Sequence, residues 1–414
     1  MSTENKKIRM LVIPSDRTGV GKFRSIDPHT YIQKHYPDEF DIDIVYIEDI
    51  PHDTLPDFLG EYDLIHIHKR LDSNMEVMNT IAFLGIPTIV DIDDYYFLGD
   101  DHPLSLASKR ENWHEPIIKH LKAATCVTTT TPIYANELLK HNKNVVVLEN
   151  AIDPNEPQFN DVKIPSNRLR FGLICGSTHL NDIRLMGGLA DLGKEVLSKI
   201  QFVLCGFDTR GTTTIYGPNG EVQRRDIRPE ESVWSRYEEF ITDNYKLVSP
   251  EHKAFLKQYI PWMDDPFTDE PYRRFWTRDI NKYGTHYQNV DVLLAPLKEN
   301  DFNKMKSQLK EIEAGFMHTA LIADKFGPYT VDTKSMLEKC GVVNEDGNCL
   351  LVEPSKNHKQ WAKYITILSN NPEMVTKLQN NLHEWVKDRY SLETVCKKRV
   401  ELYKKLVSES NKNC

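Results

Sequence analysis

The sequence predicts an α/β protein built from two doubly wound domains in series. Short apolar runs rich in β-branched residues alternate with segments of helical spacing, and this pattern restarts after a polar stretch at residues 153–168. Most of the runs lack a strict alternation of apolar and polar residues, which is typical of strands buried on both faces of a parallel sheet. The 414 residues, 40% of them hydrophobic, suffice for two or three domains at about 150 residues each.

The first predicted domain covers residues 1–155. Its helical segments include residues 74–85 and 132–142, where apolar residues recur at helical spacing. Its expected strands lie at residues 8–15, 41–48, 62–69, 87–94, 124–131 and 144–150. The alternation of strands and helices favours a parallel sheet covered by helices.

The second predicted domain covers residues 166–385. Its expected strands lie at residues 170–177, 201–207, 290–297, 319–324 and 348–354, with a helix over residues 181–200. The alternation is lost at about residues 207–288, which we interpret as an insertion with a hairpin turn at Asn219-Gly220. An interaction surface and a structural role for this insertion are equally open.

The composition argues against several classes of protein. Lys and Arg number 52 against 61 Asp and Glu, a net charge of -9, so we expect no stable binding of nucleic acid. No apolar run approaches the roughly 18 residues that span a bilayer, and the N-terminal apolar run is too short for a signal peptide. The seven cysteines form no CxxC pair, which favours reduced, buried thiols and a cytoplasmic location.

The loop after the first strand is the first candidate site. It carries Gly19 and Gly21 ahead of a predicted helix, and free N–H groups at a helix N-terminus attract phosphate. Arg24 could bind a phosphate or a carboxylate through two hydrogen bonds. The loop matches neither GxGxxG nor the Walker pattern, so an ordinary tight turn is the alternative.

Three carboxylates follow the strand at residues 87–90. Asp91, Asp93 and Asp94 are expected at its carboxyl end, where open α/β sheets bind ligands. They could hold Mg²⁺ or act as a base, contact the hydroxyls of a sugar or an acceptor, or cap a helix. All three interpretations stay open from the sequence.

The second domain offers two candidate segments. Ser177, Thr178 and His179 lie at a strand-to-helix turn, another place that favours phosphate, although a lone histidine is more often structural. Further along, Pro296 ends a buried strand and a polar loop follows, with Glu299, Asn300, Asp301 and Asn303.

A helix is predicted to begin near Lys306 and Ser307. On it, Lys306, Lys310 and Glu313 would share one face. A carboxylate there can accept both hydroxyls of a ribose, while lysines and the helix N-terminus can neutralise a diphosphate. The alternative is a solvated face of surface ion pairs.

These segments, in this order, resemble the GT-B glycosyltransferases, specifically the retaining family-4 type. The resemblance spans the chain except the insertion. The matching motifs are Thr18-Gly19-Val20-Gly21, Asn150-Ala151-Ile152-Asp153, Gly176-Ser177 with His179 and Asp182, Ala295-Pro296-Leu297, Lys306-Ser307 with Lys310 and Glu313, and residues 347–352. One departure is that Met305 stands eight positions before Glu313, where the family motif has a second Glu.

The resemblance implies a retaining hexosyltransferase that uses a UDP- or GDP-type sugar and an acceptor hydroxyl, without a metal or other cofactor. Glu313 would bind the ribose, and Lys310 with Lys306 and Ser307 would stabilise the leaving diphosphate. Asp301 or Asn303 would replace the missing Glu. Further donor contacts would come from Gly176, Ser177, His179, Gly19 and Gly21, and acceptor or sugar contacts from Arg24, Asp93 and Asp94.

The resemblance also implies that the C-terminal helix, residues 386–414, packs back on the first domain. The acceptor class and the oligomeric state stay undefined, and peripheral contact with a membrane surface is left open. A non-catalytic nucleotide- or sugar-binding protein with the same fold is the main alternative, because of the missing Glu and the insertion. An NAD-dependent oxidoreductase ranks lower, because neither half shows a clean GxGxxG with its acidic partner.

Overall fold

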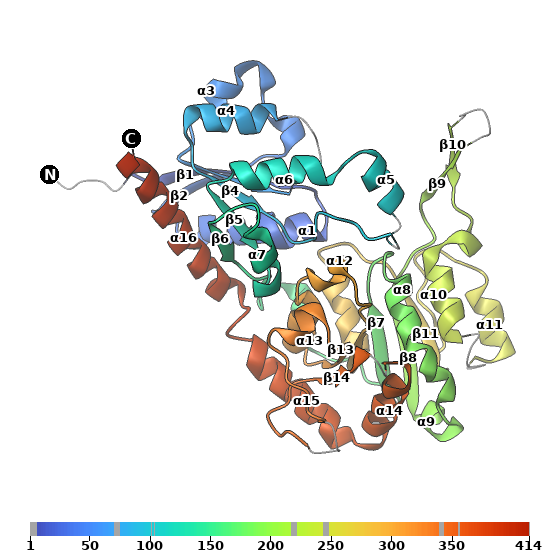
Figure 1. The fold of residues 1–414 in the computed structure, drawn as a ribbon. Helices are drawn as coiled ribbons and strands as arrows, with labels where there is room; N and C mark the ends of the chain where they lie inside the picture. Colours follow the sequence, from blue (N-terminus) through green and yellow to red (C-terminus); the bar gives the residue numbers. More distant parts are fainter. Residues whose placement is uncertain are drawn as a thin grey trace. The chain divides into compact units, whose positions relative to one another are not determined.

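The computed structural model describes residues 6–69, 75–100, 102, 104–216, 222–242, 248–338, 343–354 and 357–413 (Figure 1). The chain divides into two compact units. Unit 1 consists of residues 1–154, 299–312 and 386–414, and unit 2 of residues 155–298 and 313–385.

Unit 1 is built on a six-stranded parallel sheet in the order β2-β1-β3-β4-β5-β6. Both faces of the sheet are buried: Met10 and Val12 of β1 belong to one apolar core, and Leu11 and Ile13 to another. This double burial explains why the strands lack an alternating pattern. The strands are β1 (Ile8–Ile13), β2 (Phe40–Ile44), β3 (Leu64–His68), β4 (Thr88–Asp91), β5 (Cys126–Thr129) and β6 (Val145–Val147).

The helices of unit 1 cover both faces of this sheet (Figure 1). The C-terminal helix α16 (Leu392–Asn413) contributes Val395, Cys396 and Tyr403 to the core that contains Met10. The other helical elements are α1 (Gly19–Gly21), η1 (Lys22–Ile26), α2 (Asp27–His35), η2 (Ile47–Asp49), η3 (His52–Thr54), α3 (Leu55–Leu59), α4 (Glu76–Leu84), α5 (Ser105–Arg110), α6 (His114–Ala123), α7 (Pro132–Leu138) and α12 (Asp301–Lys304).

Unit 2 contains a second six-stranded parallel sheet, in the order β11-β8-β7-β12-β13-β14. Its strands are β7 (Leu169–Ile174), β8 (Ile200–Phe207), β11 (Tyr272–Trp276), β12 (Val292–Ala295), β13 (Ala320–Asp324) and β14 (Leu350–Val352). Strand β11 lies within the range that we interpreted as an insertion. The same range holds an antiparallel pair, β9 (Thr212–Tyr216) and β10 (Val222–Asp226); the turn predicted at Asn219-Gly220 lies outside the described residues.

The helix predicted over residues 181–200 is wrong as a single element. The structure has three short helices there, α8 (Leu180–Ile183), η5 (Arg184–Asp191) and α9 (Lys194–Lys199), and Met186 has non-helical backbone angles. The break adjoins Gly187 and Gly188, and glycine has the lowest helix propensity of all residues except proline.

The remaining helical elements of unit 2 are η4 (Pro157–Phe159), η6 (Pro229–Glu231), α10 (Val233–Thr242), α11 (Pro250–Leu256), η7 (Tyr283–Asn289), η8 (Gly327–Thr330), α14 (Asn357–Asn370) and α15 (Pro372–Val386). Helix α13 (Leu309–Phe316) contains the boundary between the two units. The predicted fold class, two parallel α/β domains with C-terminal helices that return to the first, is confirmed.

Each sheet has one point where the strand order reverses. In unit 1 it lies between β1 and β3, and in unit 2 between β7 and β12. Open α/β sheets bind ligands beside the carboxyl ends of the strands at such a point. The topology therefore selects the loops after these four strands as the candidate site of each unit.

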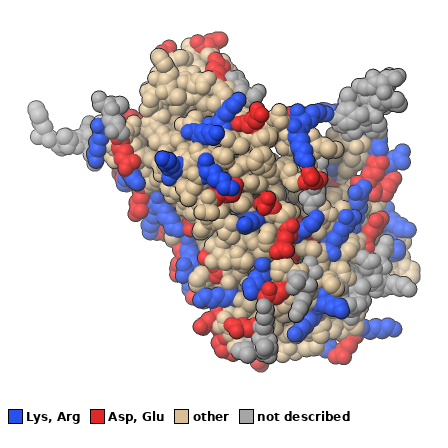
Figure 2. Space-filling model, in the orientation of Figure 1, with Lys and Arg blue, Asp and Glu red and all other residues tan. Residues whose placement is uncertain are grey.

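The surface and the helices give two further observations. On the face drawn in Figure 2, Lys and Arg side chains lie interspersed with Asp and Glu. Among the helices of the described residues, none has the length and hydrophobicity needed to cross a membrane.

Candidate functional site

The loop after β7 in unit 2 is held by a buried tyrosine. The Tyr237 hydroxyl donates to the carbonyl oxygen of Gly176 at 3.1 Å and accepts from the backbone N–H of His179 at 2.9 Å. These two bonds fix the turn Gly176–His179, which includes Ser177, at the reversal point of the sheet. The predicted donor residues of this turn therefore share one short, ordered loop.

Asp182 connects this turn to the end of β12. One carboxylate oxygen lies 2.7 Å from His179 Nδ1, and the other accepts the backbone N–H of Lys298 at 2.8 Å. Asp182 itself is buried. The two strands that flank the reversal point thus present their loops together, with the His179 ring oriented by a carboxylate.

Glu313 of α13 is the most enclosed of the predicted ligand-binding residues of unit 2. It is 1% exposed, and its two carboxylate oxygens accept hydrogen bonds from the hydroxyls of Tyr283 and Tyr287, the latter at 2.7 Å. Burial and the Glu313 charge raise the pKa of Tyr287 well above its usual range, so this phenol stays a donor. Each carboxylate oxygen can accept more than one hydrogen bond.

The segment before α13 differs from its prediction. The helix begins at Leu309, so Lys306 and Ser307 precede it, and the prediction that Lys306 shares a helical face with Lys310 and Glu313 is wrong. Asn300 instead caps the short helix α12, where its side chain accepts the N–H of Asn303 at 2.7 Å. Asn300, Asp301 and Asn303, which we expected in a loop, therefore belong to this helix and its cap.

Within this segment the predicted residues differ in exposure. Asp301 is exposed and Asn303 is 5% exposed, whereas Lys306, Ser307 and Lys310 are half-buried. Lys306 Nζ lies 5.1 Å from the centre of the Phe302 ring. The two lysines and the serine are thus partly exposed, as a phosphate contact requires.

In unit 1 an aspartate holds the glycine-bearing turn. One carboxylate oxygen of Asp16 accepts the backbone N–H of Thr18 at 2.7 Å and that of Gly21 at 3.2 Å. A Cβ atom on Gly21 would lie 1.9 Å from the carbonyl oxygen of Asp16, so only glycine fits there. Gly19 and Gly21 form the first helical turn, α1, and the Gly21 N–H is already bonded within the turn.

Arg24 does not occupy the position predicted for a ligand contact. It has no exposed surface, and its Nε and Nη2 donate to the carboxylate of Asp91 at 2.8 and 2.6 Å. Its Nη1 donates to the carbonyl oxygen of Leu148 at 2.7 Å and to Asn150 Oδ1 at 3.1 Å. Because these internal partners occupy the guanidinium, the structure does not support direct contact of Arg24 with a sugar or an acceptor.

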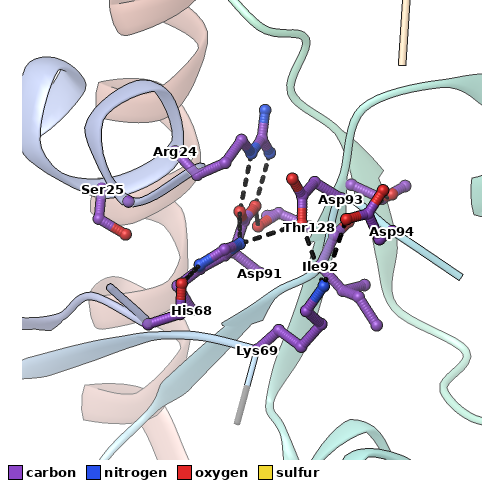
Figure 3. Close-up of polar contacts among 12 residues, drawn as sticks. Arg24, Ser25, His68, Lys69, Asp91, Ile92, Asp93, Asp94 and Thr128 are labelled. Atoms are coloured by element: carbon purple, nitrogen blue, oxygen red, sulfur yellow. Dashed lines mark hydrogen bonds and ion pairs between the residues drawn. The ribbon is translucent and has the colours of Figure 1, made fainter. Parts of the chain in front are cut away.

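Figure 3 shows the carboxylates at and just after the end of β4, Asp91, Asp93 and Asp94, among their basic neighbours. Burial alone would raise the pKa of Asp91, but the charge and hydrogen bonds of Arg24 outweigh it and hold that pKa far below its usual range. Asp93 and Asp94 each have an oxygen 3.6 Å from Lys69 Nζ. Asp93 and Asp94 therefore share one lysine as an ion-pair partner and keep some exposed surface, whereas Asp91 is buried completely.

A histidine joins the two strand ends at the reversal point of unit 1. His68, at the end of β3, lies with Nδ1 2.6 Å from Ser15 Oγ and with Nε2 3.3 Å from Asp93 Oδ1. Ser15 follows β1 and donates to Asp16 at 2.7 Å. Within the described part of the chain, no group of three or more His, Cys, Asp and Glu side chains is arranged to hold a metal ion.

Several residues that shape these sites were not predicted from the sequence: Asp16, His68, Asn150 as a side-chain partner, Tyr237, Tyr283 and Tyr287. Ser15 and His68 each follow or end a predicted strand, so the rule that ligands bind at carboxyl ends could have found them. The three tyrosines lie in the range interpreted as an insertion, where no periodic pattern indicated what they contact.

Comparison with known proteins gives structural matches only. No protein-family model and no curated protein matches the sequence. Among solved structures, HepE from Anabaena in complex with UDP and glucose is 11% identical with a TM-score of 0.59, covering 96% of this chain and 100% of that one. A glycosyltransferase from Rickettsia africae is 14% identical with a TM-score of 0.58, covering 97% and 99%.

Sucrose-phosphate synthase from Thermosynechococcus elongatus is 14% identical with a TM-score of 0.59, covering 97% of this chain and 100% of that one. At these identities the likeness concerns the fold. Matched along nearly its whole length, the chain has the GT-B fold of these glycosyltransferases.

Proposed function

We propose that the protein is a retaining glycosyltransferase, of the family-4 type, that moves a hexose from a nucleotide diphosphate sugar to an acceptor hydroxyl. The observation that carries this proposal is the arrangement in unit 2, where the ordered turn Gly176–His179 and the end of β12 meet at the reversal point of a GT-B sheet. The match to a structure that contains UDP and glucose supports a UDP-type donor.

In this proposal Glu313 accepts the ribose hydroxyls, and Tyr283 and Tyr287 hold its carboxylate in place. Ser177 and His179 face the donor from the turn after β7. Lys310, Lys306 and Ser307 meet the negative charge that develops on the diphosphate as it leaves, which lowers the barrier. The backbone at Gly19 and Gly21 approaches the diphosphate in the proposal, while the Gly21 N–H stays bonded to Asp16.

The transfer itself needs no enzyme nucleophile. The bond from the anomeric carbon to the phosphate oxygen breaks, and the acceptor oxygen bonds to that carbon on the same face. The acceptor proton passes to the departing phosphate oxygen, so the charges balance. Asp301 or Asn303 contacts the donor sugar in place of the missing Glu, and Asp93 and Asp94 orient the acceptor.

We also propose that the reaction needs no metal, since the predicted catalytic charges are those of lysines. Activity that survives EDTA would support this, and activity lost to EDTA and restored by Mg²⁺ would contradict it. A cytoplasmic location fits the five cysteines that the structure describes, Cys126, Cys175, Cys205, Cys349 and Cys396, which are all free thiols.

The test is a panel of UDP-, GDP- and ADP-sugars, with release of the nucleoside diphosphate as the readout, first without and then with candidate acceptors. Proton NMR of the product would report whether the anomeric configuration is retained. Lys310→Ala is expected to reduce turnover about 100-fold. Lys199→Ala, which removes a surface lysine paired with Glu195, is the matched control. Binding of a nucleotide sugar without turnover, unchanged in Lys310→Ala, would instead favour the non-catalytic alternative.

A further inference from the structure

We propose that Asn150 and Arg24 are positioning residues that orient the Ser307 hydroxyl toward a phosphate oxygen of the donor. This inference rests on the proposed function and adds two residues to it. Neither is proposed to touch the donor, because their polar groups bond internally: Arg24 to Asp91, Leu148 and Asn150, and Asn150 to Arg24 and Ser307.

A single side chain links two distant motifs of unit 1. Asn150 Nδ2 donates to Ser307 Oγ at 3.0 Å, and Asn150 Oδ1 accepts from Arg24 Nη1 at 3.1 Å. Arg24 in turn binds Asp91 through two hydrogen bonds. A continuous chain of hydrogen bonds therefore runs from the buried carboxylate at the end of β4 to the serine that precedes α13.

Arg24 determines which way the Asn150 amide points. A guanidinium can only donate hydrogen bonds, so the amide atom that faces Nη1 must be the oxygen. The amide nitrogen then faces Ser307, and because that nitrogen can only donate, Ser307 Oγ must accept. The chemistry of the partners therefore fixes the assignment of the two amide atoms.

This arrangement directs the hydrogen of the serine. Since Ser307 Oγ accepts from Asn150, its own O–H hydrogen points away from the amide and is available to another acceptor. Ser307 is half-buried and adjoins Lys306. A free hydroxyl hydrogen suits an anionic oxygen, because a hydrogen bond to a charged acceptor is about twice as strong as a neutral one.

The far end of the chain is rigid enough to hold this orientation. Besides Asn150, Arg24 Nη1 donates to the Leu148 carbonyl oxygen at 2.7 Å, and Asp91 accepts a further hydrogen bond from Thr128 Oγ1. The side chains of Arg24 and Asp91 are both completely buried. Rotating the Asn150 amide by half a turn would place its NH₂ group against the guanidinium. Both groups are donors, so no hydrogen bond could form between them.

The test is a double-mutant cycle with Asn150→Ala, Ser307→Ala and the double variant. Ser307→Ala is expected to lower kcat about 30-fold, and Asn150→Ala about tenfold. If Asn150 acts through Ser307, the double variant will match Ser307→Ala, since the amide has nothing left to orient. Fold losses that multiply, or an Asn150→Ala variant with normal kcat, would overturn the inference.

Asn150→Asp separates orientation from packing. The introduced carboxylate still accepts from Arg24, but it can no longer donate to Ser307, so the serine turns its hydrogen toward that carboxylate and away from the ligand. Asn150→Asp is therefore expected to match Asn150→Ala in kcat while its melting temperature stays close to that of the wild type. Wild-type kcat in Asn150→Asp would contradict the inference.

Thr129→Val is the matched control, because it removes a buried hydrogen bond of the same strand as Thr128, from Thr129 Oγ1 to the Ile92 carbonyl oxygen, that lies outside this hydrogen-bond chain. It should lower the melting temperature with little change in kcat. The same cycle is measured on UDP affinity by calorimetry. Absence of turnover in the wild type with every donor would refute the proposed function, whereas additive effects in an active or UDP-binding wild type would refute this inference alone.

Discussion

Substitutions in the ion pair between Arg24 and Asp91 can distinguish two roles for Arg24, a ligand contact and an internal support. We predict that Arg24→Met lowers the free energy of unfolding by about 3–5 kcal/mol, the usual cost of leaving a buried charge without its partner. The structure places this change at the upper end of mutational effects, because both side chains have no exposed surface and are joined by two short hydrogen bonds. In the variant Asp91 keeps Thr128 as a hydrogen-bond partner and His68 Nε2 at 3.9 Å.

A second substitution sharpens the test. Arg24→Met combined with Asp91→Leu removes both charges and replaces them with apolar side chains, which is often neutral for stability. The double variant should therefore recover most of the loss seen in Arg24→Met. Urea unfolding followed by tryptophan fluorescence gives the free energies by linear extrapolation, and Asp91→Leu alone completes the cycle.

The pH dependence has a definite sign. Arg24 lowers the pKa of Asp91 in the folded state, so the contribution of Asp91 to stability is present above the unfolded pKa of about 3.9 and is lost as pH falls below it. Without Arg24, burial favours the protonated form of Asp91. Acid therefore removes the destabilising unpaired charge in Arg24→Met. The difference between wild type and Arg24→Met should be largest near pH 7 and should shrink toward pH 4. A loss of unfolding free energy below about 1 kcal/mol in Arg24→Met, together with a raised KM for the donor or the acceptor, would refute this reasoning. Arg24 would then be a ligand contact.

Three further predictions concern other parts of the molecule. Glu313→Gln should raise the donor KM about tenfold with a smaller loss of stability than Glu313→Ala, because Ala leaves two tyrosine hydroxyls without their acceptor; equal melting temperatures for the two variants would contradict this. Gly21→Ala should lower donor turnover, since its Cβ would meet the Asp16 carbonyl, whereas Gly193→Ala, with open space around it, should not; activity assays of both decide it. Burial, with the nearby His29, lowers the pKa of His66 well below its ordinary value, so wild-type stability should fall as pH drops below about 6.5. The melting temperature of His66→Leu should therefore fall less than that of the wild type between pH 7 and 5. An equal fall in both proteins would contradict this prediction.

The fold was largely predictable because the strands are buried on both faces. Runs rich in apolar and β-branched residues, such as residues 8–13 and 124–129, have that pattern whatever helices cover them, so the two parallel sheets follow from local sequence. The single helix predicted over residues 181–200 was wrong. Its apolar spacing suits one amphipathic helix, whereas Gly187 and Gly188 favour a break. The non-helical backbone lies at Met186, directly before these two glycines.

The candidate site was harder to predict because the partners of a charged residue lie far away in the sequence. Arg24 follows a glycine-bearing turn, which favours a phosphate contact, but its partners Asp91 and Asn150 are 67 and 126 residues away. Tyr283 and Tyr287 approach Glu313 from a segment without periodicity. Local spacing indicated which residues carry charge near the strand ends, but it could not show which of those charges are already paired.

The hydrogen-bond chain from Asp91 to Ser307 affects how activity data on this protein should be interpreted. Asn150 is the first residue of Asn-Ala-Ile-Asp, and Ser307 belongs to Lys-Ser, two of the motifs on which the resemblance rests. Their side chains are bonded to each other, so a loss of turnover on changing either motif does not by itself identify a donor contact. Kinetic constants and unfolding free energies measured on the same variants are needed, because a ligand contact changes the former alone, whereas the support formed by Arg24 and Asp91 changes both.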